Sequence, residues 1–185
     1  MQQVLAERIF SRNNIIADIA LIVLGSLVVA GAAQISIPLQ PVPITGQTFA
    51  VLLVGMALGA RRGALALALY LAEGIAGLPV FAEAKFGLAT VLGPTGGYLV
   101  GFIPAAALVG WLAERGFDRN LLTTLAAMVA GNLVIYVFGL AWLTQIVGSF
   151  DIALNAGMYP FLVGDAIKAV LAALLLPAAW KLINR

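Results

Sequence analysis

Long stretches without charge constrain this chain more than any other feature. Its residues are 63% hydrophobic and 10% charged, whereas soluble domains average about 45–50% and about 25%. A soluble core of this size cannot bury so much apolar surface. We therefore predict a single-domain, all-α membrane protein over residues 1–185, with six transmembrane helices. The predicted spans are residues 15–33, 46–60, 63–77, 95–113, 121–147 and 158–181.

Two of these spans are short, and the segments around them are unusual for loops. Fifteen helical residues rise only about 22 Å, less than the roughly 30 Å of the hydrocarbon core, so spans 46–60 and 63–77 barely cross. Three prolines and no charge in residues 34–45 predict an extended loop. Residues 78–94 are apolar enough to predict a re-entrant or capping loop that is backed by protein. Residues 148–157 are expected to form a short outer loop.

The basic residues predict the orientation. With six spans, eight of the ten basic residues fall on one side of the membrane, whereas Lys85 lies on the other side and Lys168 lies within a span. Positive residues concentrate on the cytoplasmic side, so both termini are expected to be cytoplasmic, in a bacterial cytoplasmic membrane. The basic residues do not cluster as in a nucleic-acid-binding protein, and no nucleic-acid partner is expected. The eight residues on the inner side are Arg8, Arg12, Arg61, Arg62, Arg115, Arg119, Lys181 and Arg185.

The residue types that are absent exclude several classes of chemistry. There is no cysteine and no histidine, so zinc sites, iron–sulfur clusters, catalytic thiols and Ser-His triads lack a ligand or a base. The glycine-rich stretch at 93–97 lacks the Gly-Lys-Ser/Thr of a P-loop and is interpreted as a turn and helix start. We predict no enzymatic activity and no cofactor. Any energy for transport must come from another subunit or from an ion gradient.

Two charged residues in the last span are the candidate functional site. Asp165 and Lys168 are three residues apart, so on a helix they share one face. A charge near the bilayer centre costs roughly 2.5–3.5 kcal/mol on insertion scales. Two interpretations follow: an ion pair that neutralises itself inside the bundle, or a buried polar site for a ligand with hydrogen-bond donors and an anionic group.

Other uses of these charges are weaker hypotheses. A proton or ion pathway through Asp165, Lys168 and Glu73 is an alternative, although a lysine repels cations and the polar residues do not continue to the cytoplasmic face. An intramembrane aspartyl protease needs two carboxylates that share a proton, and no paired motif surrounds Glu73. Glu73 itself is either a solvated residue at a helix end or a ligand contact.

Five motifs together resemble the BioY family, the biotin-binding S components of energy-coupling-factor (ECF) transporters. The resemblance covers the chain from about residue 15 to its end, and the motifs follow in order. They are QISIP at 34–38, PVPITGQTFA at 41–50, GLPVF at 77–81, GPTGGY at 93–98 and GDAIK at 164–168.

The resemblance implies the ECF S-component fold, with biotin bound near the outer face. It implies that Lys168 meets the biotin carboxylate and that Asp165 accepts hydrogen bonds from the ureido N–H groups. Apolar loops would then close over the thiophane ring and the valeryl chain. Glu83 is the candidate for a polar residue that faces the ureido group. The remaining candidate biotin contacts are Thr45, Gln47, Phe81 and Tyr98.

The same resemblance predicts partners. Biotin is the implied ligand, whereas the lipid bilayer follows from the apolar composition. The assembly stays open between the chain alone, a homo-oligomer, and a complex with an ECF transmembrane T component and its ATPase subunits. S components commonly carry two alanines four residues apart in the first span, for docking to the T component. Here that register offers Ile22 and Ser26, or Val23 and Leu27. The alternatives within transport are a proton-coupled carrier or channel, and an S component for another small carboxylated vitamin.

Overall fold

The computed structural model describes residues 3–9 and 15–183, and most of these are helical. The elements are α1 (Leu5–Ile9), α2 (Ile15–Gln34), β1 (Ser36–Ile37), β2 (Ile44–Thr45), α3 (Gln47–Leu58), α4 (Ala60–Ile75), η1 (Ala82–Ala84), α5 (Leu88–Leu92), α6 (Gly96–Ala113), α7 (Leu121–Val147), α8 (Phe150–Gly157), η2 (Tyr159–Phe161) and α9 (Leu162–Ile183).

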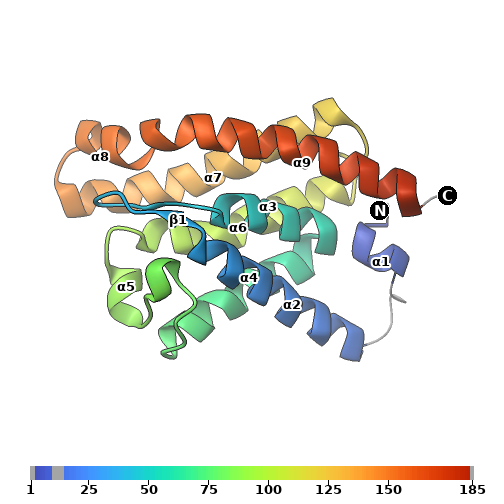
Figure 1. Ribbon diagram of the computed structural model, residues 1–185, viewed down its shortest axis with the longest axis horizontal. Coiled ribbons are helices and arrows are strands. Elements are labelled where there is room, and N and C mark those ends of the chain that lie inside the picture. The colour runs from blue at the N-terminus through green and yellow to red at the C-terminus, as the bar shows by residue number, and fades with distance from the viewer. Residues whose placement is uncertain (1–2, 10–14, 184–185) are drawn as a thin grey trace.

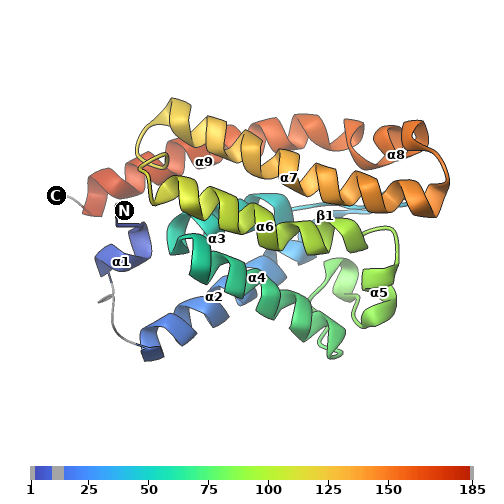
Figure 2. The same cartoon turned by 180° about the vertical axis from the view of Figure 1, so that it is seen from behind.

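Helices α7 and α9 run along the length of the molecule, whereas α2 and α4 cross obliquely on the other side of α6 (Figures 1 and 2). Helix α6 contacts α3, α4 and α7, while α2 covers α3 and α4, and α9 packs on α7 and α3. Both ends of the chain lie at one end of the molecule, and the β1–β2 hairpin, α5 and α8 lie at the other (Figure 1). Helix α6 is accordingly the most buried of the long helices.

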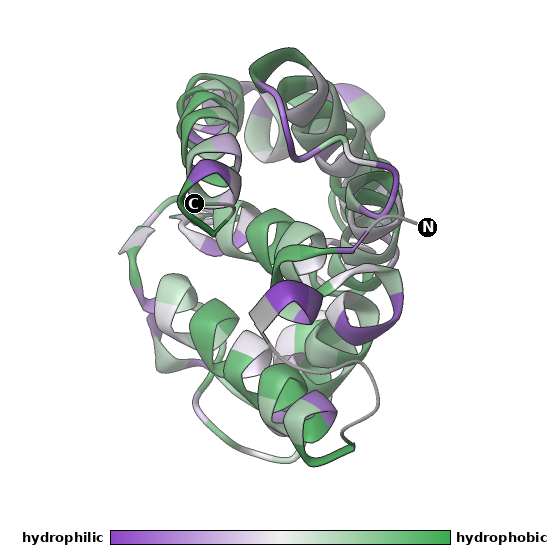
Figure 3. Ribbon diagram, turned by 90° about the vertical axis from the view of Figure 1, so that its right-hand side faces the viewer, coloured by the Kyte–Doolittle hydropathy of each residue, from purple (hydrophilic) through white to green (hydrophobic). Residues whose placement is uncertain are grey.

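The helices have the composition of a membrane protein. In the described part of the chain, four segments are long and apolar enough to cross a bilayer: α2, α6, α7 and the stretch from α8 to α9. Viewed from the end that holds both termini, the helices are mainly hydrophobic (Figure 3). Each of the six predicted spans covers most of one helix, but α3 and α4 have only 12 and 16 residues.

Two predicted loops contain more structure than expected. Residues 34–45 form an extended loop whose ends pair as an antiparallel hairpin, with Ser36 opposite Thr45 and Ile37 opposite Ile44. Residues 148–157, predicted as a loop, contain helix α8, which begins because the Ser149 side chain accepts a hydrogen bond from the Ile152 N–H.

The segment between α4 and α6 matches the prediction of a protein-backed loop only in part. Phe81 and Val91 are buried, as expected, but Phe86, Leu88 and Leu92 are exposed. The segment is held to α2 through Gln34, whose amide nitrogen lies 3.1 Å from the Phe81 carbonyl oxygen and whose amide oxygen accepts from the Ala84 N–H at 3.1 Å. Its backbone is therefore anchored on the helix bundle.

The turn between α6 and α7 is anchored to α9 by a buried acid. Asp118 has no exposed surface, and it accepts a hydrogen bond of 2.6 Å from the Trp180 indole N–H. Burial raises the pKa of the Asp118 carboxyl, and the hydrogen bond from Trp180 opposes that rise. This contact fixes α9 at the end of the molecule that is opposite the hairpin.

Glycines allow α3, α4 and α6 to approach closely. A Cβ atom at Gly55 would lie 2.6 Å from the Ala106 carbonyl oxygen and 2.9 Å from the Ala106 Cα. A Cβ atom at Gly63 would lie 2.9 Å from the Gly55 Cα. These backbone contacts leave no room for a side chain, as at close helix crossings in membranes.

We expect Gly55→Ala to destabilise the protein by about 1–3 kcal/mol, because backbone atoms of α6 must move. Thermal unfolding of the purified protein in detergent measures the change. Gly31→Ala in α2 is the matched control, since nothing lies within 4 Å of a Cβ atom there. An equal loss of stability in the two variants would contradict the close α3–α6 contact.

Candidate ligand-binding site

A cavity of about 370 Å³ lies at the end of the molecule that holds the hairpin. Most of its wall is apolar, and its volume lies within the range of small-molecule sites. The lining residues are Leu39, Gln40, Pro41, Val42, Pro43, Thr45, Gln47, Thr48, Phe81, Ala82, Lys85, Ala89, Thr90, Gly93, Pro94, Thr95, Tyr98, Leu99, Phe102, Ile135, Tyr136, Phe161, Asp165 and Lys168.

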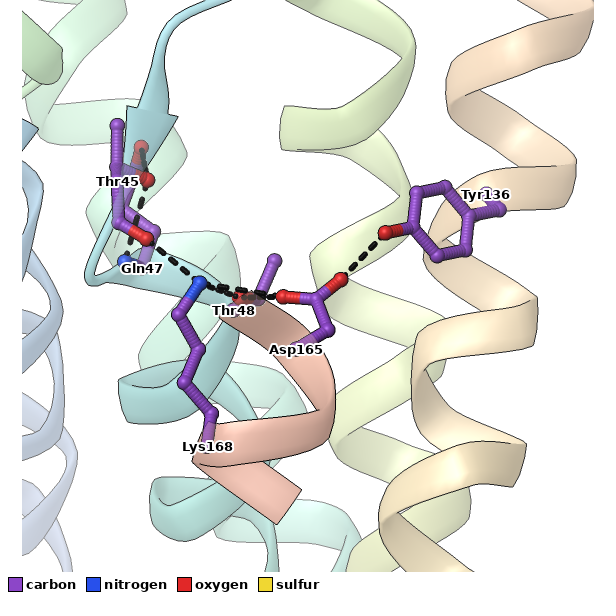
Figure 4. A network of polar contacts seen from close by, with 6 residues as sticks. All are labelled: Thr45, Gln47, Thr48, Tyr136, Asp165 and Lys168. Atoms are coloured by element: carbon purple, nitrogen blue, oxygen red, sulfur yellow. Dashed lines mark hydrogen bonds and ion pairs between the residues drawn. The ribbon is translucent and has the colours of Figure 1, made fainter. Parts of the chain in front are cut away.

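Asp165 and Lys168 both line this cavity, and they lie in a network of polar side chains (Figure 4). The Lys168 Nζ lies 3.1 Å from Asp165 Oδ1, 2.8 Å from Thr48 Oγ1 and 2.9 Å from the Thr45 carbonyl oxygen. An ammonium group has three N–H donors, so these three acceptors use all of them. The predicted pair is thus formed, and it faces a cavity.

The Asp165 carboxylate also has partners on two other helices. Thr48 of α3 donates to Oδ1 at 3.0 Å, and the Tyr136 hydroxyl of α7 donates to Oδ2. Each carboxylate oxygen has two lone pairs, so Oδ2 has room for one more donor. The buried charge is therefore stabilised by a network that still has acceptor capacity toward the cavity.

Tyr136 and Thr48 were missed as site residues by the sequence analysis. The only signal for Tyr136 is that a phenol inside an apolar span requires a hydrogen-bond partner. Thr48 gives no signal, because a threonine hydroxyl in a helix can bond to its own backbone. Their sequence distances from Asp165, 29 and 117 residues, are bridged only by the fold.

Gln47 and Thr45 lie on the same wall of the cavity. The Gln47 amide donates to the Tyr70 hydroxyl at 2.7 Å, and that hydroxyl lies 3.2 Å from the Val80 carbonyl oxygen. Thr45 Oγ1 donates to Gln47 Oε1 at 3.0 Å. Both predicted residues line the cavity, but their polar groups are already paired within the protein.

The aromatic candidates, Phe81 and Tyr98, also line the cavity. The Phe81 ring meets the Tyr70 ring edge to face, with 5.6 Å between centroids. The Tyr98 hydroxyl donates to the Gly157 carbonyl oxygen at 2.8 Å. Each therefore contributes an apolar ring surface to the cavity.

Comparison with known proteins identifies the family. The sequence model of the BioY family matches residues 2–185. This chain belongs to the BioY family. It is 46% identical over 150 residues to a biotin transporter BioY of Thermotoga maritima, covering 81% of this chain and 87% of the relative. It is 42% identical over 148 residues to a biotin transporter BioY of Rhizobium etli, covering 76% and 79%.

A solved structure shares the fold. It is the crystal structure of the S-component for biotin from an ECF-type ABC transporter, and it aligns with a TM-score of 0.82. The alignment covers 93% of this chain and 95% of that one, at 24% sequence identity. The S-component fold that the motifs implied is therefore the fold of this BioY-family chain.

Glu83 is the predicted polar contact to the ureido group. It is not among the residues that line the cavity, and its carboxylate lies 2.7 Å from the Lys85 Nζ. The backbone is left-handed at Glu83 and Ala84, with φ of 60° and 55°, which the sequence pattern did not indicate. In this BioY-family chain the turn places Lys85, rather than Glu83, on the cavity wall.

Glu73 is also not among the lining residues of the cavity. Its carboxylate accepts a hydrogen bond from the buried Ser26 hydroxyl of α2. Of the two interpretations left open, this geometry disfavours a ligand contact. Glu73 instead links α2 to α4 in this BioY-family bundle.

Proposed function

We propose that this chain binds biotin in the cavity at the hairpin end and takes it up across the bacterial cytoplasmic membrane. The observation that carries the proposal is the Asp165–Lys168 network on the wall of an apolar cavity. Relatives at 42–46% identity are named biotin transporters. An apolar slot with a few fixed polar groups suits a ligand with a fused ring, an alkyl chain and polar ends.

The geometry favours recognition of the ureido group by both charged residues. Because Lys168 Nζ and Asp165 Oδ1 are 3.1 Å apart, they cannot reach two ligand groups that are separated by a ring and a valeryl chain. A ligand carboxylate at Lys168 would also lie beside the Asp165 carboxylate, and like charges at that distance repel. We therefore assign one ureido N–H to the remaining lone pair of Asp165 Oδ2 and the ureido carbonyl to Lys168, in place of the Lys168–carboxylate contact that the resemblance implied. The ureido carbonyl would replace one of the two neutral acceptors of Lys168, the Thr45 carbonyl or the Thr48 hydroxyl.

We propose six membrane crossings with both termini in the cytoplasm. The basic residues Arg61, Arg62, Arg115, Arg119 and Lys181 lie in or beside the turns and helix ends that share the end of the molecule with both termini (Figure 1). Positive residues concentrate on the cytoplasmic side. The cavity, which lies at the opposite end, then faces the outside of the cell, where a nutrient would be captured.

We further propose an ECF T component and its ATPase subunits as the source of energy, with a homo-oligomer as the alternative assembly. The solved relative is an S-component from an ECF-type ABC transporter. Ser26 is buried and bonded to Glu73, so the pair Ile22 and Ser26 cannot form a docking surface. Val23 and Leu27 are exposed on α2 and have the same four-residue spacing. We propose that this pair docks to the T component.

The experiment is binding of labelled biotin to the purified protein in detergent. We expect saturable binding, and competition by desthiobiotin, which keeps the ureido and carboxylate groups. Thiamine and riboflavin should not compete. No saturable biotin binding, or competition by another vitamin, would refute biotin as the ligand.

A further inference from the structure

The cavity has a second cation that the proposed ureido site does not use. Among the described residues that line the cavity, two are cationic, Lys168 and Lys85. The three donors of Lys168 are taken by Asp165, Thr48 and Thr45. A ligand carboxylate would therefore find a free donor more easily at Lys85.

The Lys85 side chain is suited to exchange its partner. It is about half exposed, and its ammonium lies 2.7 Å from Glu83 Oε2. An ion pair this exposed contributes about 0–1 kcal/mol, so replacing Glu83 by another carboxylate costs little. Glu83 keeps access to water in either state, since 32% of its side chain is exposed.

The Lys85 backbone, in contrast, is fixed. Its carbonyl oxygen accepts from the Phe81 N–H at 3.1 Å, and its N–H donates to the Ala82 carbonyl oxygen at 3.2 Å. The turn is tied to α2 through Gln34 and Ala84. A long cationic side chain thus extends from an anchored turn on the cavity wall.

Lys85 and the Asp165 network lie on different sides of the cavity. The η1 turn before Lys85 packs against α2, whereas α9, which carries Asp165, packs against α7 and α3. In both ribbon views, η1–α5 and the start of α9 lie on opposite sides of the β1–β2 hairpin (Figures 1 and 2). An elongated ligand with its ureido group at Asp165 can direct its other end toward Lys85.

We propose that Lys85 binds the ligand carboxylate and releases Glu83 when it does so. This inference rests on the proposed function and adds a second recognition point to the same cavity. Lys85 then selects ligands that carry an anion at the end opposite the ureido group. Glu83 acts as a competitor that occupies Lys85 in the empty protein.

The test compares biotin with biotinamide, which lacks the negative charge, in Lys85→Met and in the unchanged protein. Lys85→Met should weaken biotin binding by about twofold to fivefold and leave biotinamide binding unchanged. Glu83→Gln should strengthen biotin binding by about twofold to fivefold and leave biotinamide unchanged, because it removes the competitor. Lys181→Met, at an exposed lysine far along α9, is the matched control for loss of a positive charge.

The outcomes separate the two proposals. If the unchanged protein binds no biotin, the proposed function fails, and this inference with it. If biotin binds but Lys85→Met leaves its affinity unchanged, or weakens biotin and biotinamide equally, Lys85 does not bind the carboxylate and only the inference fails. Thermal unfolding of each variant in detergent shows whether an equal loss reflects misfolding of the turn.

Discussion

Asp165→Asn is expected to weaken biotin binding by about 30-fold or more. The change removes the charge that accepts the ureido N–H and leaves the Lys168 ammonium, with 18% of its side chain exposed, without a counter-ion. Truncating one partner of a buried, hydrogen-bonded charge pair costs about 2–5 kcal/mol, which corresponds to about 30-fold or more in affinity. Equilibrium binding of labelled biotin measures the loss.

Asp151→Asn is the matched control for this variant, because Asp151 is exposed on α8 and is not among the lining residues. It should bind biotin as the unchanged protein does. If Asp165→Asn kept its affinity, or failed to accumulate in the membrane at all, the interpretation of Asp165 as part of a structural ion pair would gain over the ligand site.

Lys168→Met is expected to weaken biotin binding by about 30-fold or more. It removes the donor to the ureido carbonyl and leaves the Asp165 carboxylate with the neutral donors Thr48 and Tyr136 alone. The same binding assay measures the loss. Lys181→Met is the control, as for Lys85.

The double variant Asp165→Asn/Lys168→Met separates the two interpretations of the pair. Removing both charges avoids an uncompensated buried charge, so thermal stability should recover relative to the single variants. Biotin binding should stay lost, because both ureido contacts are gone. Recovery of binding together with stability would mean that the pair is structural and that the ligand binds elsewhere.

A proton-coupled carrier makes a different prediction for the same variants. If Asp165 carried protons and did not bind the ligand, Asp165→Asn would abolish proton-driven uptake and leave equilibrium binding of biotin intact. The network around Asp165 disfavours this role, since the Lys168 ammonium at 3.1 Å repels cations that approach the carboxylate. Uptake and binding measured in parallel distinguish the two functions.

Much of the fold could be predicted because helix formation in a membrane depends on local composition. A long apolar run must satisfy its own backbone hydrogen bonds as a helix, so the predicted span 121–147 coincides with α7. Helix α8 and the hairpin were missed, since they depend on a single side-chain cap at Ser149 and on pairing of short strands. In a sequence this apolar, a single capping residue or a pair of two-residue strands is too weak a signal to predict an element.

Part of the candidate site could also be predicted from the sequence. Asp165 and Lys168 stand out in the sequence, because two charges within one apolar span are costly unless something binds them. Their separation along the helix also predicts that they meet. Local chemistry was sufficient for this part of the site.

Tertiary structure alone decided which other residues complete the site. Thr48 and Tyr136 come from two other helices, and helix packing, which no local pattern encodes, brings them to Asp165. Tertiary structure also decided which residue of the η1 turn lines the cavity. Because the backbone is left-handed at Glu83, Lys85 lies on the cavity wall and Glu83 does not. The sequence by itself determined where the buried charges are and that helices carry them. Their partners depend on long-range contacts that exist only once the bundle has formed.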